Sequence, residues 1–195
     1  MNGLVISCIN SEGFQSFKCP IYRIYSIFNC QTRELAIRAA LTGHLVLSTL
    51  HTNDAPSSVV RLLDMGAPPY LISASVVAIV AQRLLRRLCD RCKAGRPLPE
   101  SLARVYGLQP GIPVYEPVGC DDCRSSGYKG RVAVVEIMEV NKRIKELINA
   151  KATESAIRQA AIESGMRLLV HSALRNVVAG VTSIDETLTV IEQSE

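Results

Sequence analysis

The sequence predicts an α/β fold, and three observations favour that class. Residues 45–50 (L-V-L-S-T-L) form a short, mostly apolar run, which is typical of a strand covered on both faces of a parallel sheet. Strong helix formers precede this run between Arg33 and Thr42, and a second helical pattern follows it. Residues 132–137 alternate as a half-buried strand does. Strands interleaved with helices indicate an α/β architecture.

The stretch that connects these elements reads L-T-G-H-L-V-L-S-T-L-H-T-N-D over residues 41–54. Gly43 is suited to end the preceding helix in a left-handed conformation. Polar residues then begin with His51, directly after the carboxyl end of the strand, which is where open α/β sheets bind ligands. His44 and His51 therefore bracket one buried strand. Such a pair is consistent with an ordinary core strand and with ligand sensing.

Composition limits the classes of protein that fit. The chain has 195 residues, of which 48% are hydrophobic and 21% charged, and this is enough for one good core or two small ones. A net charge of +4 is too small to indicate nucleic-acid binding. The longest nearly apolar run, residues 71–81, is shorter than the roughly 20 residues that span a bilayer, and no secretory segment is recognisable. We expect a cytoplasmic, globular protein.

Two helices are predicted after the central strand. Asn53 or Asp54 can cap the first, which ends near Gly66. A long helix is expected from about Tyr70 to Leu88, apolar in its first half and basic in its second. The three arginines in the basic half can form a solvated face with favourable charges near a helix carboxyl end. They can equally form a surface that meets a neighbouring subunit or an acidic ligand. These arginines are Arg83, Arg86 and Arg87.

Seven cysteines fall into two groups. Three are scattered, at Cys8, Cys19 and Cys30, and the other four form two C-x-x-C pairs. Two such pairs can give tetrahedral thiolate coordination of zinc, and four sulfur ligands leave no position for water, so the metal would be structural. Four reduced cysteines without metal are the alternative. The paired cysteines are Cys89, Cys92, Cys120 and Cys123.

Short-range patterns define the rest of the chain. A helix is expected around residues 101–106, inside the insert between the two cysteine pairs, and a strand within 127–140. Four helices then follow, at residues 142–150, 153–164 and 167–179, and from Ser183 onward with Glu186 completing a capping box. His171, on the third of them, is interpreted as an ordinary helix residue. Residues 1–30 show no clear periodicity, although I-Y-R-I-Y-S-I-F at 21–28 is compatible with a strand.

From Glu34 to about Ile191 the chain resembles the carboxyl-terminal half of the ATPases that power type II secretion and type IV pilus assembly. Several sequence motifs carry the resemblance, and they occur in the same order as in that family. They are the stretch 41–54, then R-L-L-D-M-G, A-Q-R-L-L-R-R-L-C-D-R-C, G-C-D-D-C with G-Y-K-G-R-V, and G-V-T-S-I-D-E. The resemblance implies a partial RecA-like domain of the P-loop NTPase class, with an inserted tetracysteine zinc lobe and a helical carboxyl-terminal end.

The resemblance also implies a biological setting. Such proteins are hexameric motors that use ATP and magnesium, bind zinc, and act in the cytoplasm, peripheral to the inner membrane through partners such as its platform protein. By this resemblance His44 and His51 lie near the nucleotide as sensors, and the four paired cysteines hold zinc. No nucleic-acid partner is implied.

Two catalytic features of the family do not occur in this sequence. No G-x-x-x-x-G-K-[ST] loop is present to hold phosphates and Mg²⁺. Counted back from Glu34, Ser26 stands where the family's G-E-I-R-D word has its glutamate, which prepares the attacking water, while Phe28 and Asn29 replace its arginine and aspartate. We therefore expect no ATPase activity from this chain by itself.

Four segments are predicted: an amino end that is not family-like at 1–31, the carboxyl-terminal half of a RecA-like core at 32–88, the zinc lobe with its following strand at 89–140, and a helical subdomain at 141–195. Two functions fit them. The chain is either the carboxyl-terminal part of a hexameric secretion or pilus ATPase, or a non-catalytic, zinc-stabilised module that docks on intact motor subunits.

Overall fold

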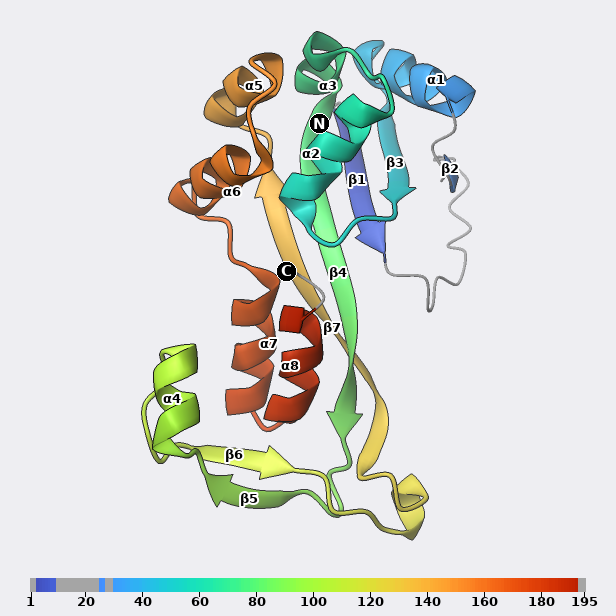
Figure 1. Cartoon of the computed structure of the whole chain (residues 1–195). Helices are drawn as coiled ribbons and strands as arrows, with labels where there is room; N and C mark the ends of the chain where they lie inside the picture. Colours follow the sequence, from blue (N-terminus) through green and yellow to red (C-terminus); the bar gives the residue numbers. More distant parts are fainter. Residues whose placement is uncertain (1–2, 10–24, 27–29, 193–195) are drawn as a thin grey trace. The chain divides into compact units, whose positions relative to one another are not determined.

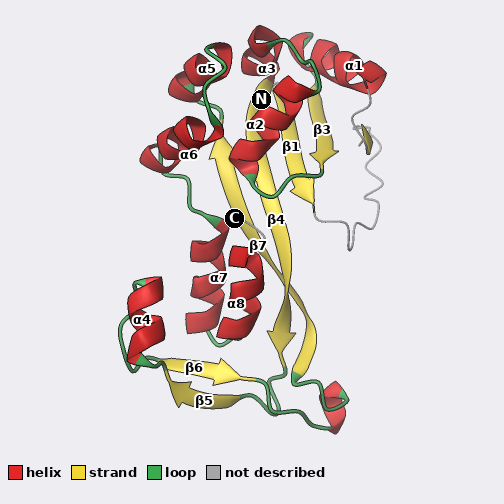
Figure 2. Cartoon of the chain, viewed as in Figure 1, coloured by secondary structure: helices red, strands yellow, loops and turns green. Residues whose placement is uncertain are grey.

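The computed structural model describes residues 3–9, 25–26 and 30–192, and gives side-chain environments for residues 34–188. A five-stranded sheet runs through the chain in the order β2-β3-β1-β4-β7 (Figures 1 and 2). Strand β1 is parallel to β3 on one side and to β4 on the other, and β2 is parallel to β3. The bounds of these strands are Gly3–Ile9 for β1, Tyr25–Ser26 for β2, Leu45–Leu50 for β3, Val76–Leu88 for β4 and Tyr128–Glu139 for β7.

The strand predicted at residues 45–50 is confirmed as β3. The middle position of the sheet, however, belongs to β1, which the sequence did not reveal. Strand β1 lies between β3 and β4, with its Gly3–Cys8 stretch in register with Leu45–Leu50. Its residues had been assigned to no element. Most of the predicted strand at 21–28 lies outside the described residues, and only β2 represents it. The sheet therefore begins in the amino end of the chain.

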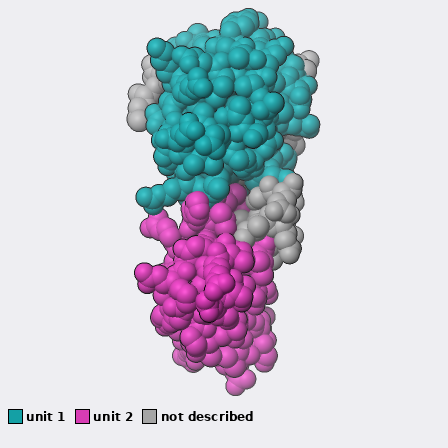
Figure 3. Space-filling model, turned by 60° about the vertical axis from the view of Figure 1, so that its left-hand side comes forward, with its two compact units in different colours: residues 1–82, 135–168 teal, residues 83–134, 169–195 magenta. Residues whose placement is uncertain are grey.

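Two compact units divide the chain, and Figure 3 colours them separately. Unit 1 comprises residues 1–82 and 135–168, and unit 2 comprises residues 83–134 and 169–195. These boundaries fall within β4, within β7 and before the third of the four predicted carboxyl-terminal helices. They differ from the four segments expected from the sequence because compactness joins residues that are distant along the chain.

Unit 1 contains five helices among its described residues. Residue Gly43, with a φ of 102°, follows the first of them, in agreement with its predicted role. Side chains of Asp54, Asn141 and Thr153 cap the second, fourth and fifth. Within the unit α2 packs on α6 and α3 packs on α5. The bounds are Cys30–Leu41 for α1, Ala55–Asp64 for α2, Pro69–Ser75 for α3, Lys142–Asn149 for α5 and Glu154–Glu163 for α6.

The predicted helix from Tyr70 to Leu88 is wrong. Only α3 is helical, and the chain turns at Val76 into β4, which is 13 residues long. Burial in β4 follows a period of two, because Ile79, Ala81 and alternate residues beyond them are buried. Its β-branched residues suit a strand, and pairing with β1 supplies the partner that local sequence does not reveal.

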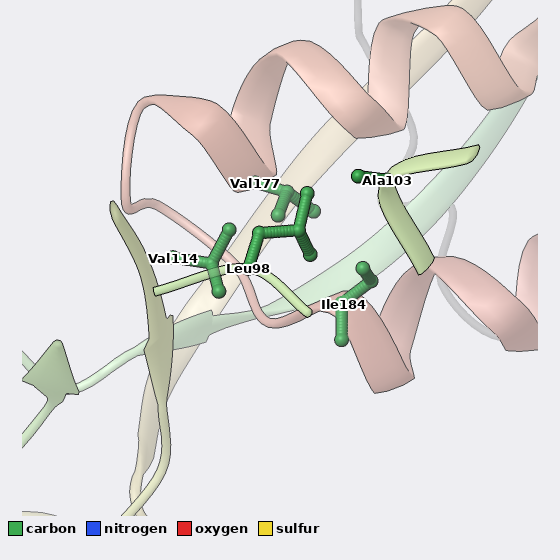
Figure 4. Close-up of a cluster of buried hydrophobic side chains, with 5 residues drawn as sticks. All are labelled: Leu98, Ala103, Val114, Val177 and Ile184. Atoms are coloured by element: carbon green, nitrogen blue, oxygen red, sulfur yellow. The ribbon is translucent and has the colours of Figure 1, made fainter. Parts of the chain in front are cut away.

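Unit 2 is built from the segment between the cysteine pairs and the last two helices. The predicted helix in the insert is confirmed as α4, and a β5-β6 hairpin flanks it. Five buried side chains from both parts of the unit form one cluster: Leu98, Ala103, Val114, Val177 and Ile184 (Figure 4). The bounds are Ala94–Pro97 for β5, Glu100–Tyr106 for α4, Pro113–Glu116 for β6, Asp121–Cys123 for the 3₁₀ turn η1, Leu169–Val178 for α7 and Ile184–Glu192 for α8.

The amino end of α2 depends on one buried carboxylate. We expect Asp54→Ala to lower the free energy of unfolding by about 2 kcal/mol, since it removes a helix cap and leaves the Arg158 guanidinium without that partner. Asp54→Asn keeps a capping oxygen and should cost roughly half as much. Urea titration of the full chain measures both effects.

Asp64→Ala is the matched control, because Asp64 is exposed at the other end of the same helix. Its effect should be close to zero. Equal losses for Asp54→Ala and Asp64→Ala would contradict the role assigned to Asp54.

Candidate functional site

The four paired cysteines converge on one point of unit 2. Cys89 and Cys92 belong to the turn that follows β4, while Cys120 directly precedes η1 and Cys123 is its last residue. The sulfur atoms all lie within 4.8 Å of one another, with separations of 3.9 Å for Cys89 to Cys120 and 3.8 Å for Cys92 to Cys123. A tetrahedral zinc ion with bonds of about 2.3 Å requires sulfur separations of about 3.8 Å. The cluster therefore fits a metal ion of this size.

Backbone N–H groups point at the sulfurs and favour the thiolate form. Cys123 Sγ accepts from the N–H of Cys120 at 3.2 Å and of Gly127 at 3.2 Å. Burial opposes ionisation of Cys123, but these donors outweigh it and lower its pKa to about 6. Burial raises the pKa of Cys92 to about 11, despite the N–H of Gly119. The Cys92 and Cys123 thiols thus differ in how readily they ionise, and a bound cation would favour the thiolate form of both.

Two glycines allow this turn to form. Gly119 has a φ of 107°, and a Cβ there would lie 2.7 Å from the Ser125 carbonyl oxygen. Gly127 has a φ of 74°, and a Cβ there would lie 2.3 Å from the Pro117 Cβ. Both positions require a left-handed backbone and space for no side chain. The glycines therefore position the donors described above.

Backbone hydrogen bonds and an ion pair attach the turns that carry the four cysteines to the rest of unit 2. The N–H of Cys89 donates to the Gly127 carbonyl at 2.9 Å. Lys93 Nζ donates to the Gly180 carbonyl at 2.9 Å and also pairs with Asp90. The second cysteine pair is therefore fixed to the first, and the first to the turn between α7 and α8. With four sulfur ligands, this arrangement is suited to a structural ion and not to catalysis.

A second group of polar residues gathers at the carboxyl end of β3 in unit 1. Asp54 is only 3% exposed; its Oδ1 accepts from the Ser57 N–H at 2.8 Å and its Oδ2 accepts from Arg158 at 2.6 Å. The same guanidinium reaches Glu154 at 2.6 Å. Glu136, which is 2% exposed, accepts the Ala55 N–H at 3.0 Å. Two buried carboxylates thus hold the amino end of α2.

The structure separates the two histidines. His44 precedes β3, within 3.3 Å of the Thr42 hydroxyl, and His51 follows β3; both are exposed. Seven steps along an extended strand cover roughly 23 Å. The two histidines therefore lie at opposite ends of β3, and their role as nucleotide sensors stays a prediction.

The three arginines of the predicted basic helix, which lie on β4, differ in burial and in their partners. Arg83 is buried at 6% exposure, which contradicts a solvated face for that residue. Arg86 pairs with the buried Glu186 and lies 4.1 Å from the centre of the Tyr128 ring. These contacts raise the pKa of Arg86, chiefly through the hydrogen bond to Glu186. Arg87 bonds to Asp90 at 2.9 Å. Arg86 and Arg87 are thus paired within unit 2.

Sequence reasoning missed Glu136 and Arg158 as supports of this edge. Glu136 lies 81 residues from its partner Ala55, and Arg158 lies 104 residues from Asp54. The available signal for Glu136 was a charge on the inward side of a strand between the apolar residues Val134 and Met138. Arg158 gave no comparable signal, because an arginine on an amphipathic helix is common.

Solved structures with a similar backbone identify the fold of the chain. The pilus retraction motor PilT with bound ADP matches 97% of this chain and 52% of its own, with a TM-score of 0.57 at 19% identity. The ATPase DotB of Legionella pneumophila matches 89% of this chain and 39% of its own, with a TM-score of 0.56 at 16% identity. The chain therefore has the α/β fold of these ATPases.

Sequence comparison shows the family. The model of the type II/IV secretion system protein family matches residues 26–189, and the chain belongs to this family. The match begins inside the segment 1–31 that sequence reading had set apart as not family-like.

Curated relatives support the assignment. The type IV pilus assembly ATPase PilB of Myxococcus xanthus is 45% identical over 176 residues, which are 86% of this chain and 31% of that protein. The type II secretion system protein E of Aeromonas hydrophila is 38% identical over 175 residues, 89% of this chain and 35% of that protein. The chain thus spans about a third of the length of these relatives.

The metal cluster makes a prediction that chemistry can test. Purified chain should contain one zinc ion, and Cys120→Ser should lose it together with the folding of unit 2, because metal binding on the order of 10 kcal/mol is coupled to folding. Elemental analysis, thermal unfolding in excess chelator, and the spectrum of a cobalt(II)-substituted sample measure this.

Cys30→Ser is the control, since Cys30 lies outside both pairs, and it should keep one zinc ion per chain. A thermal midpoint that does not change in excess chelator would argue against a structural metal.

Proposed function

We propose that this chain acts as the carboxyl-terminal part of a ring-forming ATPase motor that powers type II protein secretion or type IV pilus assembly. The family match over residues 26–189 is the observation that carries the proposal. Relatives named as type IV pilus assembly ATPases and as type II secretion system protein E support it. Because the chain corresponds to only about a third of those proteins, the activity of the whole motor is part of the proposal.

In this proposal the carboxyl edge of β3 faces the nucleotide. His51 is the residue of this edge that we assign to nucleotide sensing, since its imidazole is exposed directly after the strand. Asp54 and Arg158 hold the adjacent helix in place. His44, at the opposite end of β3, is the second residue that the family resemblance assigns to nucleotide sensing. ATP and magnesium would be bound by this edge together with groups that the chain does not itself supply.

We further propose that the four cysteines hold zinc as a structural ion. The sulfur separations, the converging N–H donors and the tetrathiolate donor set support this assignment. When bound, the ion would cross-link the turn after β4 to η1. Its role would be to give unit 2 a fixed shape.

The proposed partners are further copies of the chain in a hexamer, or intact motor subunits, together with the inner-membrane platform protein of the machine. Within the described residues no helix is both long enough and apolar enough to cross a bilayer. We propose a cytoplasmic location, with membrane association through those partners. We propose no nucleic-acid partner, since the net charge of +4 is small.

A second candidate function is favoured by a specific observation. The sequence contains no G-x-x-x-x-G-K-[ST] loop, and Ser26 stands at the position of the family's catalytic glutamate. A serine hydroxyl cannot accept a proton from water as a carboxylate does. This favours a non-catalytic, zinc-stabilised module that docks on intact motor subunits and regulates the ring.

Native mass spectrometry with and without Mg-ATP separates the two functions. A chain that carries zinc, takes up no nucleotide and joins intact motor subunits when these are added would support the regulatory module. A hexamer that carries ATP would support the motor for the chain as it stands. A zinc-loaded monomer that binds neither nucleotide nor motor subunits would contradict both.

ATP turnover provides a separate prediction. The purified chain should hydrolyse ATP no faster than the buffer does, because it lacks the phosphate loop and the carboxylate that activates water. Phosphate release with the wild-type chain and with His51→Ala measures this. Turnover that disappears in His51→Ala would overturn the prediction, while turnover unaffected by the substitution would indicate a contaminating ATPase.

A further inference from the structure

A cavity of about 610 Å³ lies in unit 2, away from the metal cluster. The end of α4 and one side of α7 form its walls, through Tyr106, Leu108, His171, Leu174, Arg175 and Val178. Its volume falls in the range of about 300 to 1,000 Å³ that is typical of binding pockets. Neither the proposed zinc site nor the β3 edge uses these residues.

The walls of this cavity are fixed by the core beneath them. Tyr106 and Leu108 pack against the buried cluster that contains Ala103 and Val177. Figure 4 shows Ala103 and Val177 among the cluster's side chains, which come from α4, α7 and neighbouring segments. Because both walls rest on one packed core, the cavity is preformed. Binding would therefore cost little conformational entropy in the protein.

The α7 wall of the cavity presents a row of exposed side chains. His171, Arg175 and Val178 are spaced four and three residues apart, and therefore lie on one face of the helix. All three are exposed, and Val178 is 46% exposed although it is apolar. Leu174 lies between them and is nearly buried. The row therefore presents the apolar Val178 side chain beside the Arg175 guanidinium.

Charge determines what this cavity can accept. Its lining contains a guanidinium and an imidazole but no carboxylate. Among the described residues Arg175 forms no ion pair, whereas Arg104 on α4 is paired with Glu100 at 2.5 Å. Tyr106 adds a hydroxyl donor: burial, and the nearby Asp185 carboxylate, raise its pKa, so the phenol keeps its proton.

We propose that this cavity is a docking site for an acidic, amphipathic segment of a partner protein. An apolar side chain of the segment would enter between Leu108, Leu174 and Val178, and a neighbouring Glu or Asp would meet the Arg175 guanidinium, with Tyr106 as a second donor. Charge complementarity favours this occupant, because the side chains of the lining include the Arg175 guanidinium and no carboxylate.

The probes are three short helical peptides that share two leucines four residues apart and carry Glu, Gln or Lys between them. Backbone amide NMR of the full chain should show shifts confined to residues 104–108 and 171–179 with the Glu peptide. We expect the Gln peptide to bind about fivefold more weakly and the Lys peptide more weakly still. Added salt should weaken binding of the Glu peptide and not of the Gln peptide.

Arg175→Gln tests the residue directly and should reduce affinity for the Glu peptide to that for the Gln peptide. Arg61→Gln, an exposed arginine on α2 of unit 1, is the matched control and should change neither affinity. Val178→Ser should weaken the Glu and Gln peptides equally, since it removes only apolar surface.

Several results would overturn the proposal. These are the absence of shifts with all three peptides, shifts outside the two segments, or equal binding of Glu and Lys peptides. Binding of vesicles of anionic phospholipid that depends on Arg175, without peptide binding, would replace the protein partner with a lipid surface. Self-association that is lost in Arg175→Gln would replace it with a second copy of the chain.

Discussion

Two buried carboxylates determine how unit 1 is held together. Asp54 and Glu136 are almost fully excluded from solvent, and an unpaired charge in that position would be costly. Asp54 is satisfied by the amino end of α2 and by Arg158, and Glu136 accepts the Ala55 N–H. Strand β3, helix α2, strand β7 and helix α6 therefore meet at one point. The edge that carries His51 has its geometry because these charges need partners.

Unit 2 is stabilised in a different way. Its insert between the cysteine pairs is rich in proline and glycine and forms only a short hairpin and one short helix. A small core cluster and the four converging sulfurs supply what regular structure does not. Small lobes of this kind commonly depend on a metal for part of their stability. The same core that anchors the insert to α7 also shapes the cavity proposed as a docking site.

The family assignment and the chemistry of this chain point in different directions. Residues 26–189 match the type II/IV secretion system protein family, and the four cysteines lie together in one cluster. The given sequence corresponds to about a third of its relatives and contains no G-x-x-x-x-G-K-[ST] loop. Function therefore has to be argued from the sites that this segment carries and not from its fold alone.

The sequence by itself determined the elements whose signals are local. It predicted β3 from a short apolar run, a helix cap at Asn53 or Asp54, of which Asp54 is the one used, the glycine end at Gly43, and the four carboxyl-terminal helices. It also predicted the four cysteines as one group, because C-x-x-C spacing places two sulfurs on one turn. These features depend on residues that are a few positions apart.

Only the tertiary structure decided what depends on distant partners. The run 76–88 is a strand because β1 pairs with it, although its apolar and basic residues also suit a helix. Strand β1 is central because of that pairing, although its own sequence has no turn or alternation to identify it. The partners of Asp54 and Ala55 come from 104 and 81 residues away, and no local pattern encodes contacts over such distances.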